Sequence, residues 1–163
     1  MEWSDILYKS CYAMIGAFGF GVIFNIKKEY LLYAGLGGFV GWLVFELMLG
    51  SDYNISVSLF FASCIVTVYS EYMARRLKVP ATIIIICGII PLVPGGAMYY
   101  TTLEAINGDE LSFLRKMIDT MFQAGAIAIG IVLVSTVARI ILRKILPKLR
   151  KAKLKKSKSL VKS

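Results

Sequence analysis

The sequence predicts an all-α membrane protein, a polytopic bundle of five transmembrane segments with the fourth broken at Pro91 to Gly96. Of its 163 residues 58% are hydrophobic, and the mean hydropathy of +0.71 lies well above the soluble range. Five apolar segments are about 20 residues long, the length that crosses a bilayer. Pro91, Pro94, Gly95 and Gly96 interrupt one of them, and no helix continues unbroken through that combination.

The expected segments and their connections also predict an orientation. Connections after the first and third segments are short and basic, whereas the one after the second has no base and the one after the fourth has three acids against two bases. Under the positive-inside rule, the N-terminus is extracytoplasmic and the C-terminus cytoplasmic, so we expect a multi-pass protein of the cell membrane. The five segments are 6–26, 31–50, 55–74, 80–106 and 120–142, and the expected long connection is 107–119.

The net charge of +9 comes from the end of the chain. From Arg139 onward there are 11 Lys and Arg residues and no acid. This run follows an apolar helix and lacks interleaved aromatic residues, so it predicts binding to anionic lipid and no binding to nucleic acid. We therefore divide the chain into a transmembrane domain, residues 1–146, and a basic cytoplasmic tail, residues 147–163.

The broken fourth segment predicts a site within the membrane. Pro80 suits a first helical turn, and residues 81–90 would rise about 15 Å, half of the hydrocarbon thickness. At that depth, freed backbone groups must be satisfied by neighbouring protein or by a water-filled cavity. The alternative is a helix kink or a tight turn in a protein with four spans.

The two helix ends at this break would offer opposite partial charges. A carboxylate could bind the amides of Gly95, Gly96 and Ala97. A cation or ammonium group could bind the carbonyl groups near Ile89 and Ile90. Broken helices in secondary transporters hold small charged solutes in this way.

Polar residues inside the other segments are candidates for coupling or gating. Glu46 lies about one turn from the outer end of its segment, where it has either an interfacial or a coupling role. Glu71 precedes Arg75 by four residues, a spacing that favours an intrahelical ion pair. Asn25, Thr120 and Gln123 either line a polar cavity or bond neighbouring helices. The coupling or gating candidates are Glu46, Glu71 and Asn25.

The residues that enzymes use most often are missing or isolated. There is no histidine, and Cys11, Cys64 and Cys87 stand singly in apolar segments. Neither a metal site nor a disulfide framework is expected. We find no nucleophile elbow and no phosphate-binding glycine loop. The sequence therefore predicts no enzyme and no cofactor.

Several motifs resemble the threonine/serine exporter family. They are Gly-Phe-Gly-Val-Ile-Phe before Asn25, Ala-Arg-Arg-Leu-Lys-Val-Pro-Ala-Thr at 74–82, Gly-Ile-Ile-Pro-Leu-Val-Pro-Gly at 88–95, Tyr99, and Asn-Gly-Asp at 107–109. The resemblance is to the short form, which corresponds to the C-terminal membrane half of full-length members, and it covers about residues 10–140. Gly96 stands where many members have another small or polar residue.

The resemblance implies export of small hydroxy amino acids, driven by the proton motive force, with a larger membrane subunit as partner. A related two-component pair is associated with dicarboxylate export, so succinate stays open as a substrate, as do a homo-oligomer and a channel or scaffold subunit. The family's Pro-Gly motif maps onto Pro91, Pro94 and Gly95. The candidate substrate-binding residues are Gly88, Pro91, Pro94, Gly95, Gly96, Tyr99 and Thr101.

Overall fold

The computed structural model describes the backbone of residues 3–160 and the side chains of residues 3–141. Every regular element in these residues is helical, which confirms the predicted fold class. The elements are α1 (Trp3–Ile23), α2 (Lys28–Leu49), α3 (Ile55–Leu77), α4 (Ala81–Ile89), the 3-10 turn η1 (Ile90–Leu92), α5 (Gly95–Asn107) and α6 (Glu110–Leu160).

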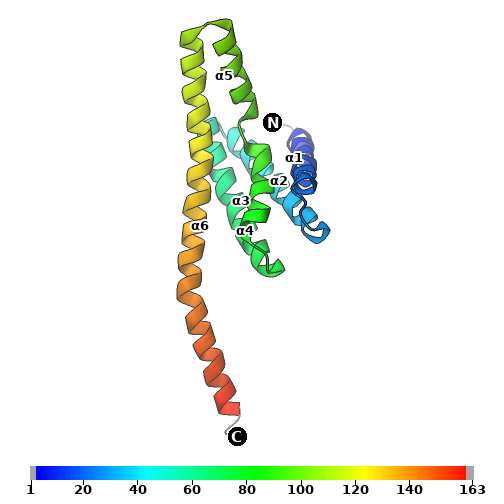
Figure 1. Ribbon diagram of the computed structural model, residues 1–163, viewed down its shortest axis with the longest axis vertical. Coiled ribbons are helices and arrows are strands. Elements are labelled where there is room, and N and C mark those ends of the chain that lie inside the picture. Colours follow the sequence, from blue (N-terminus) through cyan, green and yellow to red (C-terminus); the bar gives the residue numbers. More distant parts are fainter. Residues whose placement is uncertain (1–2, 161–163) are drawn as a thin grey trace.

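Helices α1 to α4 form a bundle, and the long α6 lies along one side of it (Figure 1). Helix α6 packs against α3 and, through its first turns, against α5. Among the described helices, α5 packs against α6 alone. The α5–α6 hairpin therefore projects beyond the end of the bundle, as Figure 1 shows.

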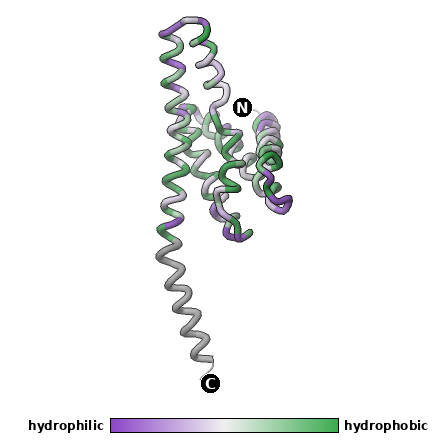
Figure 2. Tube along the Cα trace, viewed as in Figure 1, coloured by the Kyte–Doolittle hydropathy of each residue, from purple (hydrophilic) through white to green (hydrophobic). Residues whose placement is uncertain are grey.

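Four of these helices are long and apolar enough to cross a membrane, and the bent pair of α4 and α5 makes a fifth if it is one span. The two parts of that pair meet at an angle of 54°. Figure 2 shows hydrophobic residues along the bundle, hydrophilic residues at the helix connections, and mostly pale, intermediate colours along α5. The second half of the broken segment is thus the less apolar half.

Small residues bring the middle of α2 close to its neighbours. A Cβ atom on Gly38 would lie 2.6 Å from the Cβ of Ala17 in α1. One on Gly41 would lie 2.6 Å from Val66 in α3, and one on Gly88 in α4 would lie 3.3 Å from the backbone of Gly37. Only glycine permits these backbone approaches. We call Gly37, Gly38, Gly41 and Gly88 the packed seam.

The prediction of a long connection at 107–119 is wrong. Helix α6 begins at Glu110, so only Gly108 and Asp109 join it to α5. Gly108 ends α5 with a left-handed φ of +78°, which favours glycine. Asp109 then starts α6, because its Oδ1 accepts a hydrogen bond from the Ser112 amide at 3.1 Å. The acids of the expected connection instead cap α6, as Asp109 does, or lie in its first three turns, as Glu110 and Asp119 do.

The last part of α6 carries most of the basic residues. Its backbone continues as helix past position 147 to Leu160. The side chains from residue 142 onward and all of residues 161–163 lie outside the described part. The predicted contact between the basic tail, residues 147–163, and anionic lipid therefore stays a prediction.

Candidate functional site

The break between α4 and α5 follows from its two prolines. Pro91 has no amide hydrogen for the α-helical ladder, and the chain tightens into η1 at Ile90–Leu92. Val93 and Pro94 are not helical, and α5 begins at Gly95. The Gly95 amide donates to the Val93 carbonyl at 2.7 Å, and the Met98 amide donates to the Pro94 carbonyl at 3.0 Å. The chain therefore turns within two residues.

Contacts of η1 show that the break begins beside the middle of α2. The Pro91 Cγ would lie 3.4 Å from a Cβ atom on Gly38, and the Leu92 Cδ1 would lie 3.3 Å from one on Gly41. Both glycines are near the centre of α2, which runs from Lys28 to Leu49. The break thus starts beside the middle of α2, and its predicted depth in the membrane stays a prediction.

The residues that follow η1 are much less enclosed. Val93, Gly95 and Gly96 are exposed, and Pro94 and Ala97 are half-buried. No heavy atom lies within 4 Å of a Cβ atom built on Gly95 or Gly96. Helix α5 has no side-chain cap, and of its first three amides only that of Gly95 is bonded, so the Gly96 and Ala97 amides remain available to a solute. We call residues 93–97 the open stretch.

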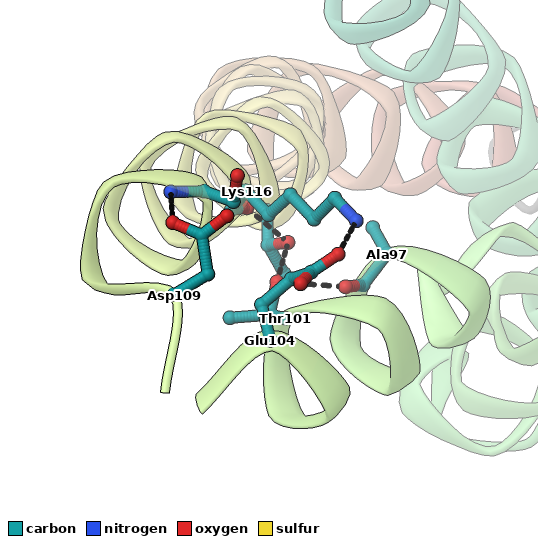
Figure 3. Close-up of polar contacts among 7 residues, drawn as sticks. Ala97, Thr101, Glu104, Asp109 and Lys116 are labelled. Carbon is teal, nitrogen blue, oxygen red and sulfur yellow. Dashed lines mark hydrogen bonds and ion pairs between the residues drawn. The ribbon is translucent and has the colours of Figure 1, made fainter. Parts of the chain in front are cut away.

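Polar side chains hold α5 against α6, as Figure 3 shows. The hydroxyl groups of Thr101 and Thr120 lie 3.1 Å apart, within hydrogen-bonding distance. Glu104 accepts a hydrogen bond from Lys116 and forms an ion pair with it. The Lys116 ammonium also lies 5.5 Å from the centre of the Tyr100 ring. These contacts fix α6 beside the middle and the last turns of α5.

A cavity of about 360 Å³ lies between these helices. We call it the α5–α6 cavity, and its lining residues are Ala97, Tyr100, Lys116, Asp119 and Gln123. A second cavity of about 420 Å³ shares Asp119 and Gln123 with it and reaches Asn54 and Ser56 at the start of α3. Polar groups from α3, α5 and α6 therefore converge beside the open stretch.

The predicted substrate-binding residues have different surroundings. Gly88 is buried in the packed seam. Pro94, Gly95 and Gly96 belong to the open stretch, and the Tyr99 side chain is exposed. Thr101 bonds the Ala97 carbonyl and Thr120, so it contributes to helix contact.

The predicted coupling candidates all lie away from the α5–α6 cavity. Glu46 of α2 pairs with Lys9 of α1 at 3.0 Å, a partner that the sequence did not suggest. The expected ion pair of Glu71 with Arg75 is present at 3.1 Å. Asn25 follows α1 with a left-handed φ of 54° and is exposed. Its conformation suits the end of a helix.

Sequence reasoning missed Tyr100, Lys116 and Asp119 as cavity residues. Lys116 and Asp119 were assigned to a loop, whereas they lie one turn apart on α6. The signal was present, because Lys116, Asp119 and Gln123 are spaced by three and four residues, the period of one helix face. The sequence left two roles open for Gln123 and Thr120, lining a polar cavity or bonding a neighbouring helix. Gln123 has the first role and Thr120 the second.

Two further observations limit the chemistry of the site. In the described part of the chain, no group of three His, Cys, Asp or Glu residues could hold a metal ion. Asp109 lies outside the membrane-spanning segments. The hydrogen bonds that its carboxylate accepts from Ser112 hold the pKa of this carboxyl below its usual range. Asp109 is therefore a helix cap that stays ionised at neutral pH.

Comparison with known proteins gives one family. The family model described as "Threonine/Serine exporter, ThrE" matches residues 9–137. An uncharacterized protein of Haemophilus influenzae (strain ATCC 51907 / DSM 11121 / KW20 / Rd) is 26% identical over 136 residues. That match covers 78% of this chain and 46% of the relative, so the chain spans about half of the relative's length. No solved structure matches the chain.

Proposed function

The chain belongs to the threonine/serine exporter family, and we propose on that premise that it is the small membrane subunit of a secondary transporter. This transporter exports small amino acids such as threonine and serine, driven by the proton motive force. The observation that carries the proposal is the open stretch. A helix break that starts beside the middle of α2 and leaves Gly95 and Gly96 exposed suits a solute path better than a packed kink.

The proposed path needs a second wall. Among the described helices α5 packs only against α6, so the face of the open stretch that points away from α6 is uncovered. Lipid is a poor neighbour for free backbone amides. We propose that a larger membrane subunit of the same family covers this face. A second copy of the chain is the alternative partner.

The hydrogen bonding at the break favours binding of a solute's carboxylate over binding of its ammonium group. The Ile90 carbonyl accepts a hydrogen bond from the Val93 amide at 3.2 Å, and Ile89 is buried. Of the two carbonyl groups that the sequence suggested for an ammonium group, one is thus occupied and the other belongs to a buried residue. The Gly95 amide is likewise occupied, because it donates to the Val93 carbonyl, so the predicted carboxylate partners are reduced to the Gly96 and Ala97 amides.

The experiment measures export from vesicles that contain this chain and the larger partner, with radiolabelled threonine, serine and succinate as separate probes. We expect saturable export of threonine and serine that depends on the proton gradient. Export of succinate alone would support the dicarboxylate alternative. Linear, uncoupled conductance would support a channel.

Gly95→Val tests the open stretch in the same vesicles. No neighbouring atom meets the new Cβ, so we expect normal insertion, while the added side chain blocks approach to the backbone and abolishes export. Gly16→Val is the matched control, because Gly16 of α1 is also exposed and free of close neighbours. Normal export by Gly95→Val would reject the site and favour a scaffold role.

Proton coupling is proposed for one of the membrane carboxylates. Glu46 and Glu71 each have a basic partner, Lys9 and Arg75, and both carboxylates are mostly buried. Glu46→Gln and Glu71→Gln should be compared in the vesicle assay. If one carries the proton, its variant loses dependence on the gradient. If both variants keep that dependence, neither is the carrier.

A further inference from the structure

We infer that the α5–α6 cavity binds the transported amino acid, with Asp119 as the partner of its ammonium group. This inference rests on the proposed function and adds to it the site of recognition and a reason for substrate choice. Its basis is the cavity between α5 and α6 and the unequal pairing of the two charged residues that line it.

The position of the cavity suits a small solute on the proposed path. Its volume of about 360 Å³ lies near the lower end of the range of about 300–1,000 Å³ that is usual for ligand pockets. Ala97, at its edge, belongs to the open stretch. The second cavity joins it through Asp119 and Gln123 and continues toward the start of α3. The two cavities therefore offer a polar lining from the break toward the start of α3.

Charge pairing within the cavity is asymmetric. Lys116 is neutralised by Glu104. Asp119 lies one turn further along the same face of α6, and it has no ion pair or hydrogen-bond partner among the described side chains. Lys116 carries one positive charge, and Glu104 and Asp119 carry one negative charge each, so these three residues together have a net charge of −1. The cavity therefore favours a solute that brings an ammonium group and disfavours a second carboxylate.

Two more lining groups are free to recognise the rest of the solute. The Tyr100 hydroxyl and the Gln123 amide have no hydrogen-bond partner among the described residues. Both can donate and accept hydrogen bonds. A serine or threonine hydroxyl would find a partner there, and the carboxylate would meet the free amides at the start of α5, where Ala97 borders the cavity. The site thus matches a zwitterion with a polar side chain, and it distinguishes an amino acid from succinate by charge.

The test uses the vesicles described above and measures the KM for radiolabelled threonine. Losing one charged hydrogen bond corresponds to about a tenfold to hundredfold effect, so we expect Asp119→Asn to raise the KM by that factor. Asp119→Glu keeps the charge and should restore most of the affinity. Glu110→Gln removes an exposed acid from the start of the same helix, outside the cavity, and should leave the KM unchanged.

Competition separates recognition of the ammonium group from a general defect. N-acetylthreonine lacks the positive charge, so it should compete poorly with threonine in the wild type. In Asp119→Asn this discrimination should disappear. An unchanged KM and unchanged discrimination in Asp119→Asn, with an active wild type, would overturn this inference alone. A wild type that exports neither threonine nor serine would overturn the proposed function and this inference with it.

Discussion

The packed seam and the open stretch are both rich in glycine, but their glycines have opposite surroundings. In the seam, any Cβ atom on Gly38, Gly41 or Gly88 would meet a neighbour at less than 3.0 Å. In the open stretch, a Cβ atom on Gly95 or Gly96 would meet nothing within 4 Å. Seam glycines therefore serve helix packing, whereas packing gives no reason for the glycines of the open stretch. This contrast supports the proposal that the open stretch borders the solute path.

Gly38→Val should produce the largest effect on stability. The new Cβ would lie 2.6 Å from the Ala17 Cβ and 2.9 Å from the Ala13 carbonyl oxygen, so α1 and α2 must separate. Overpacking of this kind costs about 1–3 kcal/mol. We expect a lower melting temperature in detergent and less protein in the membrane. Gly96→Val, which meets no neighbour, is the control, and equal losses in both variants would remove the contrast.

Thr101→Val should have a moderate effect on stability, confined to the α5–α6 hairpin. It removes the hydrogen bond to Thr120, and bonds of this type between membrane helices are worth about 0.6 kcal/mol on average. A double-mutant cycle with Thr120→Val should give a coupling energy of that size. Thr102→Val is the matched control, because Thr102 bonds only the Met98 carbonyl of its own helix. Equal effects of the two single variants would mean that the contact with Thr120 contributes nothing.

Acid should have the smallest effect, at the tip of the hairpin. Because Ser112 lowers the pKa of folded Asp109, the cap contributes stability above the unfolded pKa, and this is lost as pH falls through the folded value. We therefore expect amide exchange in the first turn of α6 to increase below about pH 4. Asp109→Asn keeps a capping side chain but does not titrate, so the exchange of this first turn should not show that increase. If both proteins respond alike, the cap is not the cause.

Much of the fold was predictable because the membrane imposes simple rules. The length of the apolar segments predicted the spans, and Pro91 with Pro94 predicted the break. The hairpin was not predicted, since acids at 107–119 suggested a connection. Asn-Gly-Asp at 107–109 held the better signal, a left-handed glycine followed by a capping aspartate.

The candidate site was only half predictable from sequence. Backbone groups at the break follow from local chemistry, so Pro94, Gly95 and Gly96 could be named in advance. The pairing of Glu46 with Lys9 joins positions 37 residues apart, and periodicity within one helix carries no information on such a contact. Asp119 became a candidate only when α6 proved to extend along α5.

The central claim is that the open stretch borders the solute path, and substrate protection of a cysteine at Gly96 tests it most directly. In vesicles with the partner subunit, Gly96→Cys should react with a hydrophilic thiol reagent, and threonine should slow that reaction. The unmodified chain, with Cys11, Cys64 and Cys87, gives the background. Gly96→Cys that reacts no faster than this background, or at a rate that threonine does not change, would contradict the account.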